Sequence, residues 1–212
     1  MRLRIAAVIC GCIALMAGPL RAQHEMHVTG AIVPDSAIIL FNNLGPHTRA
    51  ITTAVPGAQA YFDQGMRLAY GFGMPEARRS FEAAIRQDPD CAMCHWGLAW
   101  SLGPYVNGTM DSIGGARAYE HIQHALQLRR NGTDAERALI EAMAKRYAAV
   151  PTRQNRAQLD TVYMNAMRDV MRRFPDDLDV ATLFAESIMV LRPWNYWTKG
   201  GAPQPGIDEL LR

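Results

Sequence analysis

The chain has 212 residues, of which 49% are hydrophobic and 20% are charged, a composition typical of one soluble globular or solenoid domain. Its formal net charge of +2 provides no basic surface field of the kind that recruits nucleic acid, so we expect no nucleic-acid partner. Removal of the N-terminal segment described next takes away three arginines and leaves 19 basic against 20 acidic residues, which is still close to neutral.

Residues 1–22 have the features of a secretory signal peptide. Arg2 and Arg4 form a short basic region, residues 5–16 form an apolar core, and Leu20-Arg21-Ala22 resembles a cleavage site. The apolar core is too short to span a bilayer, which needs about 20 residues. We therefore predict cleavage after Ala22, export to the periplasm or beyond, and no membrane span in the mature chain.

Predicted export changes both the number of cysteines in the mature chain and their expected chemical state. Cys10 and Cys12 lie within the apolar core and are removed with the signal peptide, which leaves Cys91 and Cys94. In an oxidising compartment, a pair this close in sequence is expected to form a disulfide, to be joined to haem or to bind a metal.

Residues 23–57 are predicted to be irregular, because prolines, glycines and a threonine-rich stretch interrupt them. Within them, residues 37–45 are either a short strand or a segment that packs on the first helices. His24 and His27 are of a residue type that binds metals, but their place near the mature N-terminus favours a mobile polar tail.

The strongest structural pattern begins at residue 58. Five residues follow one another at intervals of 12, 4, 3 and 5, namely Gly65, Ala77, Phe81, Ala84 and Pro89. The small residues let two antiparallel helices approach closely, the large residue fills the gap between them, and the proline ends the second helix. This spacing resembles that of the tetratricopeptide repeat. The resemblance implies an all-α, right-handed solenoid of antiparallel helix pairs over residues 58–212.

Further helices are predicted along the rest of the chain. Thr133 and Glu136 form a capping box that opens one of them. The last residues, IDELLR, have the pattern of a first helical turn, so we expect the chain to be the N-terminal part of a longer protein. The predicted helices cover residues 58–70, a segment from Pro75, residues 92–102, a segment with Ala118, Ile122 and Ala125, and residues 133–149, 155–174 and 178–191.

Four segments, LGPHT, YFDQGMRLAYGF, DPDCAMCHWGLAWSLGP and LRPWNYWT, resemble a family of long exported bacterial tetratricopeptide-repeat proteins of unknown function. The resemblance covers residues 44–212. It implies a helical scaffold that binds partners along a concave surface, and it supplies no catalytic residues. Gly73-Met74 departs from the family's pattern, which tends to have an Asn-His pair in this turn, so any role of that histidine is absent here.

The pentapeptide Cys91-Ala92-Met93-Cys94-His95 carries a second signal. CxxCH is the attachment motif of c-type haem, and predicted export agrees with covalent haem c at Cys91, Cys94 and His95. The alternative is a disulfide between Cys91 and Cys94, with His95 as a packing residue between helices. A dithiol redox site and a zinc site are weaker interpretations, because neither a βαβ pattern nor a second CxxC accompanies the pair.

A haem at this motif needs a second axial ligand. Met74 lies at the opposite end of its helix pair, about 20 Å away by helical rise. His121 and His124 lie in the second half of the antiparallel partner helix, near the level of His95. They are therefore the candidate distal ligands.

The sequence has no GxSxG, phosphate-binding loop, HExxH or pair of carboxylates at a usable spacing, so we predict that the protein is not an enzyme. Trp194, Tyr196 and Trp197 either line a peptide groove or pack on the next repeat. The sequence thus predicts an exported scaffold for protein or peptide partners, without a metal site. The alternative is a periplasmic mono-haem electron-transfer protein that uses the CxxCH motif.

Overall fold

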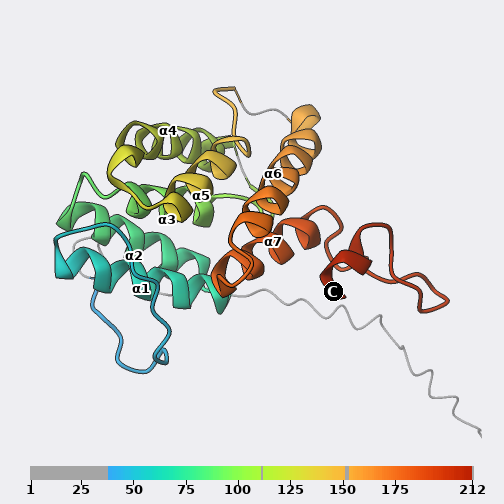
Figure 1. Cartoon of the computed structure of the whole chain (residues 1–212), viewed down its shortest axis with the longest axis horizontal. Coiled ribbons are helices and arrows are strands. Elements are labelled where there is room, and N and C mark those ends of the chain that lie inside the picture. Colours follow the sequence, from blue (N-terminus) through green and yellow to red (C-terminus); the bar gives the residue numbers. More distant parts are fainter. Residues whose placement is uncertain (1–37, 111, 151–152, 212) are drawn as a thin grey trace, which may run out of the picture. The chain divides into compact units, whose positions relative to one another are not determined.

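The computed structural model describes residues 38–110, 112–150 and 153–211, and within them the protein is all-α, as predicted, with seven α-helices and no strand (Figure 1). The predicted signal peptide, with its cleavage site, lies outside the described residues. No described helix has the length and apolar character required to cross a bilayer. The elements are α1 (Pro56–Tyr70), α2 (Met74–Gln87), α3 (Ala92–Leu102), α4 (Ser112–Leu128), η2 (Arg129–Asn131), α5 (Asp134–Ala144), α6 (Arg153–Arg173), α7 (Leu178–Val190) and η3 (Ile207–Leu211).

Local sequence explains where the helices begin. Proline occupies the first turn of both α1 and α2, where its missing N–H needs no partner. The capping box of α5 is present, because Thr133 and Glu136 each accept a hydrogen bond from the other's backbone N–H. Asp177 caps α7 by accepting from the Val180 N–H at 3.1 Å.

The helix bounds agree with the prediction to within about two residues, the usual uncertainty of helix ends, except after α5. This helix ends at Ala144 and not at residue 149, because the following side chains turn into the core. The guanidinium of Arg146 donates to the Pro104 carbonyl at 2.6 Å, and the hydroxyl of Tyr147 donates to the Ala99 carbonyl at 2.6 Å. Buried polar groups require such partners, and the turn supplies them.

Residues 38–45 contain no strand and pack along α1. Tyr61 donates its hydroxyl hydrogen to the Ile38 carbonyl at 3.0 Å, and the Gln64 amide donates to the Ile39 carbonyl at 3.0 Å. The Phe41 N–H in turn donates to the Gln64 side-chain oxygen at 2.7 Å. Of the two arrangements considered for this segment, the structure has the one in which it packs on the first helices.

The first three helices pack around one aromatic side chain. Phe81 of α2 is completely buried, and its ring lies against Gly65 of α1 and Gly97 of α3. A β-carbon added at Gly65 would lie 2.6 Å from the ring, and one added at Gly97 would also overlap it. Ala77 and Ala84 are completely buried as well. The small residues of the sequence pattern therefore allow the close approach of these helices.

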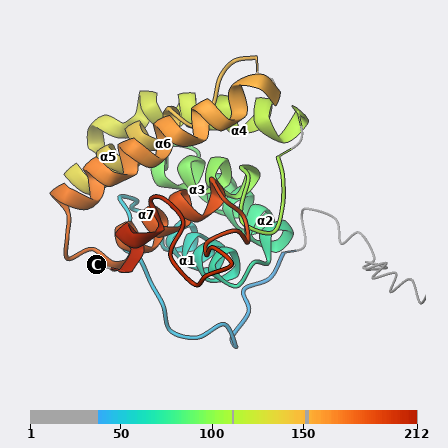
Figure 2. The same cartoon turned by 90° about the vertical axis from the view of Figure 1, so that its right-hand side faces the viewer.

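The seventh helix returns to the beginning of the described chain. In both views α7 lies next to the ends of α1 and α3 (Figures 1 and 2). The hydroxyl of Tyr70 on α1 donates to Asp179 on α7 at 2.7 Å, and the indole N–H of Trp100 on α3 donates to Glu186 on α7 at 3.2 Å. Helices that are distant in sequence thus meet at one place.

Candidate functional site

The cysteine pair lies at the start of α3. Cys91 is the N-cap residue, and its sulfur accepts from the Cys94 backbone N–H at 3.1 Å. The two cysteines form a disulfide, and they are 1% and 0% exposed. The bridge therefore closes the first turn of a buried helix and is not presented to solvent.

Loss of this disulfide is expected to lower the free energy of unfolding by about 1–2 kcal/mol, because the loop that it closes is short. The double variant Cys91→Ser, Cys94→Ser keeps an N-cap oxygen and so isolates the effect of the cross-link. Urea denaturation of both proteins without reductant measures the difference. Rapid alkylation of the two sulfurs in the native, unreduced protein would contradict the disulfide.

Three histidines meet where α3 packs on α4. His95 is 6% exposed, and its Nδ1 lies 2.9 Å from Nδ1 of His121. Its Nε2 lies 3.0 Å from the Pro89 carbonyl oxygen, which can only accept, so the proton of His95 is on Nε2 and His121 donates to Nδ1. The ring centroids of His95 and His124 are 4.4 Å apart. The structure thus brings both candidate distal residues to His95.

His95 and His121 are uncharged at neutral pH. Burial is the main cause that lowers the pKa of His95 to about 4, and His121 and His124 lower it further, against the hydrogen bond to Pro89. Burial also lowers the pKa of His121, as do Arg117 and His124. The close contact of His95 with His121 is tolerated because neither of these two rings carries a charge at neutral pH.

Acidification is expected to destabilise the protein between pH 6.5 and about pH 4. In this range His95 binds a proton in the unfolded chain but not in the folded one, so its contribution is complete above pH 6.5 and is lost as the pH falls. We expect a loss of about 1–2 kcal/mol, less than the roughly 3 kcal/mol of a fully dry site, because the exposed His124 opens the cluster to solvent.

Denaturant unfolding of the wild type and of His95→Gln, measured across this pH range, tests the effect. Glutamine retains a donor toward the Pro89 carbonyl but does not titrate, so most of the pH dependence should disappear. The same pH dependence in both proteins would exclude His95 as its source.

The CxxCH residues do not fit a covalent haem in this conformation. Haem c needs a thioether to each sulfur, and here the two sulfurs are bonded to each other and buried. It also needs a ring nitrogen of His95 on the iron, and both nitrogens lie within hydrogen-bond distance of protein atoms. Within the described part of the chain, no three His, Cys, Asp or Glu side chains are arranged to hold a metal ion.

A pocket of about 200 Å³ lies between α1, α3 and α7. Its walls are almost entirely apolar, and four of the lining residues are aromatic, namely Tyr70, Phe72, Trp100 and Tyr105. The rings of Tyr70 and Trp100 pack edge to face with centroids 5.7 Å apart, and those of Phe72 and Tyr105 stack at 6.5 Å. Sites for drug-sized molecules usually exceed about 300 Å³, so this pocket suits one side chain or a small group.

The backbone of Phe72 is strained at the rim of this pocket. Its φ of 62° lies in the left-handed region, which costs a residue other than glycine about 1 kcal/mol or more. Its side chain is nevertheless 55% exposed, so core packing does not explain the conformation. The turn between α1 and α2 thus holds an exposed aromatic ring beside the opening.

Glu186 is the acidic group of the pocket. It is half-buried, its Oε2 accepts from the Trp100 indole N–H, and it has no ion-pair partner among the described residues. Burial raises the pKa of Glu186, against the lowering effects of Arg146 and of the Trp100 hydrogen bond. The pocket therefore combines aromatic walls with one carboxylate.

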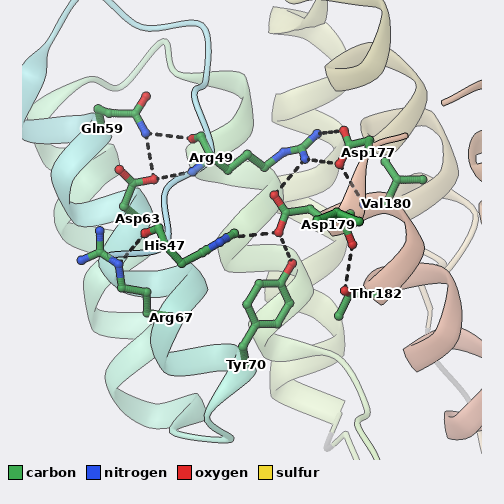
Figure 3. A network of polar contacts seen from close by, with 11 residues as sticks. His47, Arg49, Gln59, Asp63, Arg67, Tyr70, Asp177, Asp179, Val180 and Thr182 are labelled. Atoms are coloured by element: carbon green, nitrogen blue, oxygen red, sulfur yellow. Dashed lines mark hydrogen bonds and ion pairs between the residues drawn. The ribbon is translucent and has the colours of Figure 1, made fainter. Parts of the chain in front are cut away.

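A polar network joins α7 to α1 and to residues 47–49 (Figure 3). The guanidinium of Arg49 donates to both carboxylate oxygens of Asp177, at 2.9 and 3.0 Å, and to Asp179 at 3.1 Å. Asp179 also accepts from Tyr70 and lies 3.1 Å from Nε2 of His47. These contacts hold Tyr70, a wall residue, in one orientation.

Sequence reasoning missed this pocket. Its residues come from four helices and two turns that share no spacing. The one available signal was an aromatic residue between two glycines, Gly71-Phe72-Gly73, which is typical of a special turn. The aromatic residues that the sequence did single out lie elsewhere. Trp194 and Trp197 are 75% and 52% exposed, and Tyr196 packs partly buried against the core.

No protein-family model, no curated protein and no solved structure matches this sequence.

Proposed function

We propose that this protein is an exported helical scaffold that binds a protein or peptide partner, one side chain of which enters the pocket between α1, α3 and α7. The single observation that carries the proposal is the pocket itself, an aromatic cavity of about 200 Å³. Its size matches one anchoring side chain, and anchors of this kind dominate the binding energy of protein interfaces. The strained, exposed Phe72 at its rim further supports a binding role.

The scaffold is, in this proposal, a right-handed stack of tetratricopeptide-like helix pairs. The packing of Phe81 against Gly65 and Gly97 supports it, because small residues of one pair and its neighbour meet the same large side chain. The contact of α7 with α1 and α3 then closes one side of the stack, and the pocket lies at this closure.

The location is periplasmic or secreted in this proposal. It is supported by the disulfide between Cys91 and Cys94, since such bonds form and persist mainly in oxidising compartments. The partner would accordingly be another exported protein or a peptide in the same compartment.

Selection of displayed random peptides against the exported protein tests the proposal. We expect enriched peptides to bind the wild type and to bind at least about tenfold more weakly to Ala185→Phe, which fills the pocket, and to Phe72→Asn, which keeps the turn but removes the rim ring. Ala157→Phe, the same substitution on an exposed face of α6, is the matched control. Peptides that bind all four proteins equally, or no enrichment at all, would refute the proposal.

A further inference from the structure

The carboxylate of Glu186 distinguishes this pocket from a plain apolar one. The other acidic groups nearby are paired, since Asp177 and Asp179 contact Arg49, and Asp160 contacts Arg156 at 2.8 Å. Glu186 has only the Trp100 indole N–H as a hydrogen-bond donor and has no ion pair within the described residues. Among the described residues, it is therefore the one carboxylate of this group that forms no ion pair.

Arg146, the buried cation that acts on Glu186, forms no ion pair with it. Arg146 is completely buried, and its positive charge lowers the pKa of Glu186. Its guanidinium, however, donates to the Pro104 carbonyl and lies over the Tyr163 ring, 4.6 Å from the ring centroid. It also lies 3.7 Å from Asp160. Glu186 thus lines the pocket without an ion pair among the described residues.

Any group that enters the pocket removes water from this carboxylate. An apolar group would leave Glu186 desolvated without compensation, which costs free energy. An ammonium group would instead supply a charge-assisted hydrogen bond and would be attracted to the faces of surrounding aromatic rings. Aromatic walls with one carboxylate therefore favour a cationic occupant over an apolar one.

We propose that the pocket receives the side chain of a lysine of the partner, with its alkyl chain along the aromatic wall formed by Tyr70 and Trp100 and its ammonium group on Glu186. This inference rests on the proposed function, because it names the anchor that the partner presents. A lysine fits the dimensions, since its unbranched chain fills a narrow cavity and its ammonium is compact. Burial raises the pKa of Glu186 despite the lowering effect of Arg146, so an ammonium group at hydrogen-bond distance would further stabilise the charged carboxylate.

Two small probes separate charge from shape. N-acetyl-lysine methylamide and N-acetyl-norleucine methylamide have the same backbone and the same linear side chain, except that norleucine lacks the ammonium group. Titration of the full chain, followed by tryptophan fluorescence and by the NMR signal of the Trp100 indole N–H, should show at least about tenfold tighter binding of the lysine probe. Glu186→Gln, which keeps an acceptor for the Trp100 N–H, should abolish this preference.

Glu141→Gln is the matched control, because Glu141 lies exposed on α5 in an ion pair with Arg129, and it should keep the preference. Equal affinity for the two probes, or a preference that survives in Glu186→Gln, would overturn the inference. Displayed peptides that enrich an apolar anchor would also overturn it while leaving the proposed function intact. Glu186-dependent binding of the lysine probe without any enriched peptide would instead refute the proposed function and leave only the ammonium preference of the pocket.

Discussion

Replacing Phe81 with alanine is expected to lower the free energy of unfolding by about 3–5 kcal/mol. Phe81 is completely buried, and its ring contacts α1 at Gly65 and α3 at Gly97, where no side chain is present to move into the space left behind. The substitution therefore removes apolar burial and leaves a cavity between three helices. Urea denaturation followed by circular dichroism measures the loss.

The cost of a substitution at Gly97 should depend on the side chain at position 81. Gly97→Ala alone is expected to cost about 1–3 kcal/mol, since the added methyl group overlaps the ring. In a Phe81→Leu background the same change should cost at least about 1 kcal/mol less, because the overlap is relieved. Gly200→Ala is the control, as an added β-carbon there has its nearest neighbour 3.9 Å away. Additive effects of the two substitutions would show that the ring does not lie against Gly97.

Most of the helical framework could be predicted from sequence because its causes are local. α3 has the predicted bounds, and the capping box at Thr133 starts α5 where the sequence places it. The spacing of Gly65, Ala77 and Phe81 also predicted a closely packed helix pair. Small and large residues at helical intervals determine how closely two helix axes can approach. The predicted end of α5 was wrong, because the contact of Arg146 with the distant Pro104 determines where this helix ends.

The pocket could not be predicted because it depends on the return of α7 to α1. The residues that make this contact, Arg49, Tyr70 and Asp179, are separated by more than 100 positions at their widest, and nothing in their spacing indicates that they meet. Glu186 likewise has the sequence context of an ordinary solvated helix residue. Its partner Trp100 lies 86 residues away, so only the tertiary structure distinguishes it from an exposed acid.

Arg49→Ala is expected to destabilise the protein by about 3 kcal/mol, because removal of one partner leaves two largely buried carboxylates without their counter-charge. The side chain of Arg49 is only 10% exposed, and its guanidinium bridges Asp177 and Asp179. These contacts join residues 47–49 and α1 to α7 (Figure 3). Chemical denaturation measures the change. Arg172→Ala, which breaks an ion pair with Asp169 whose side chains are both at least 70% exposed, should cost well under about 1 kcal/mol.

The pH dependence of this loss identifies its origin. Burial alone raises the pKa of Asp177, but hydrogen bonds from Arg49 and from the Val180 N–H reverse this, so the pKa is lowered overall in the folded protein. The stabilisation by Asp177 is therefore complete above the ordinary aspartate pKa of 3.8 and is lost as the pH falls below it. The difference between the wild type and Arg49→Ala should be largest at neutral pH and should shrink in acid. A difference that stays constant with pH would mean that Arg49 stabilises α7 through packing of its side chain and not through its charge.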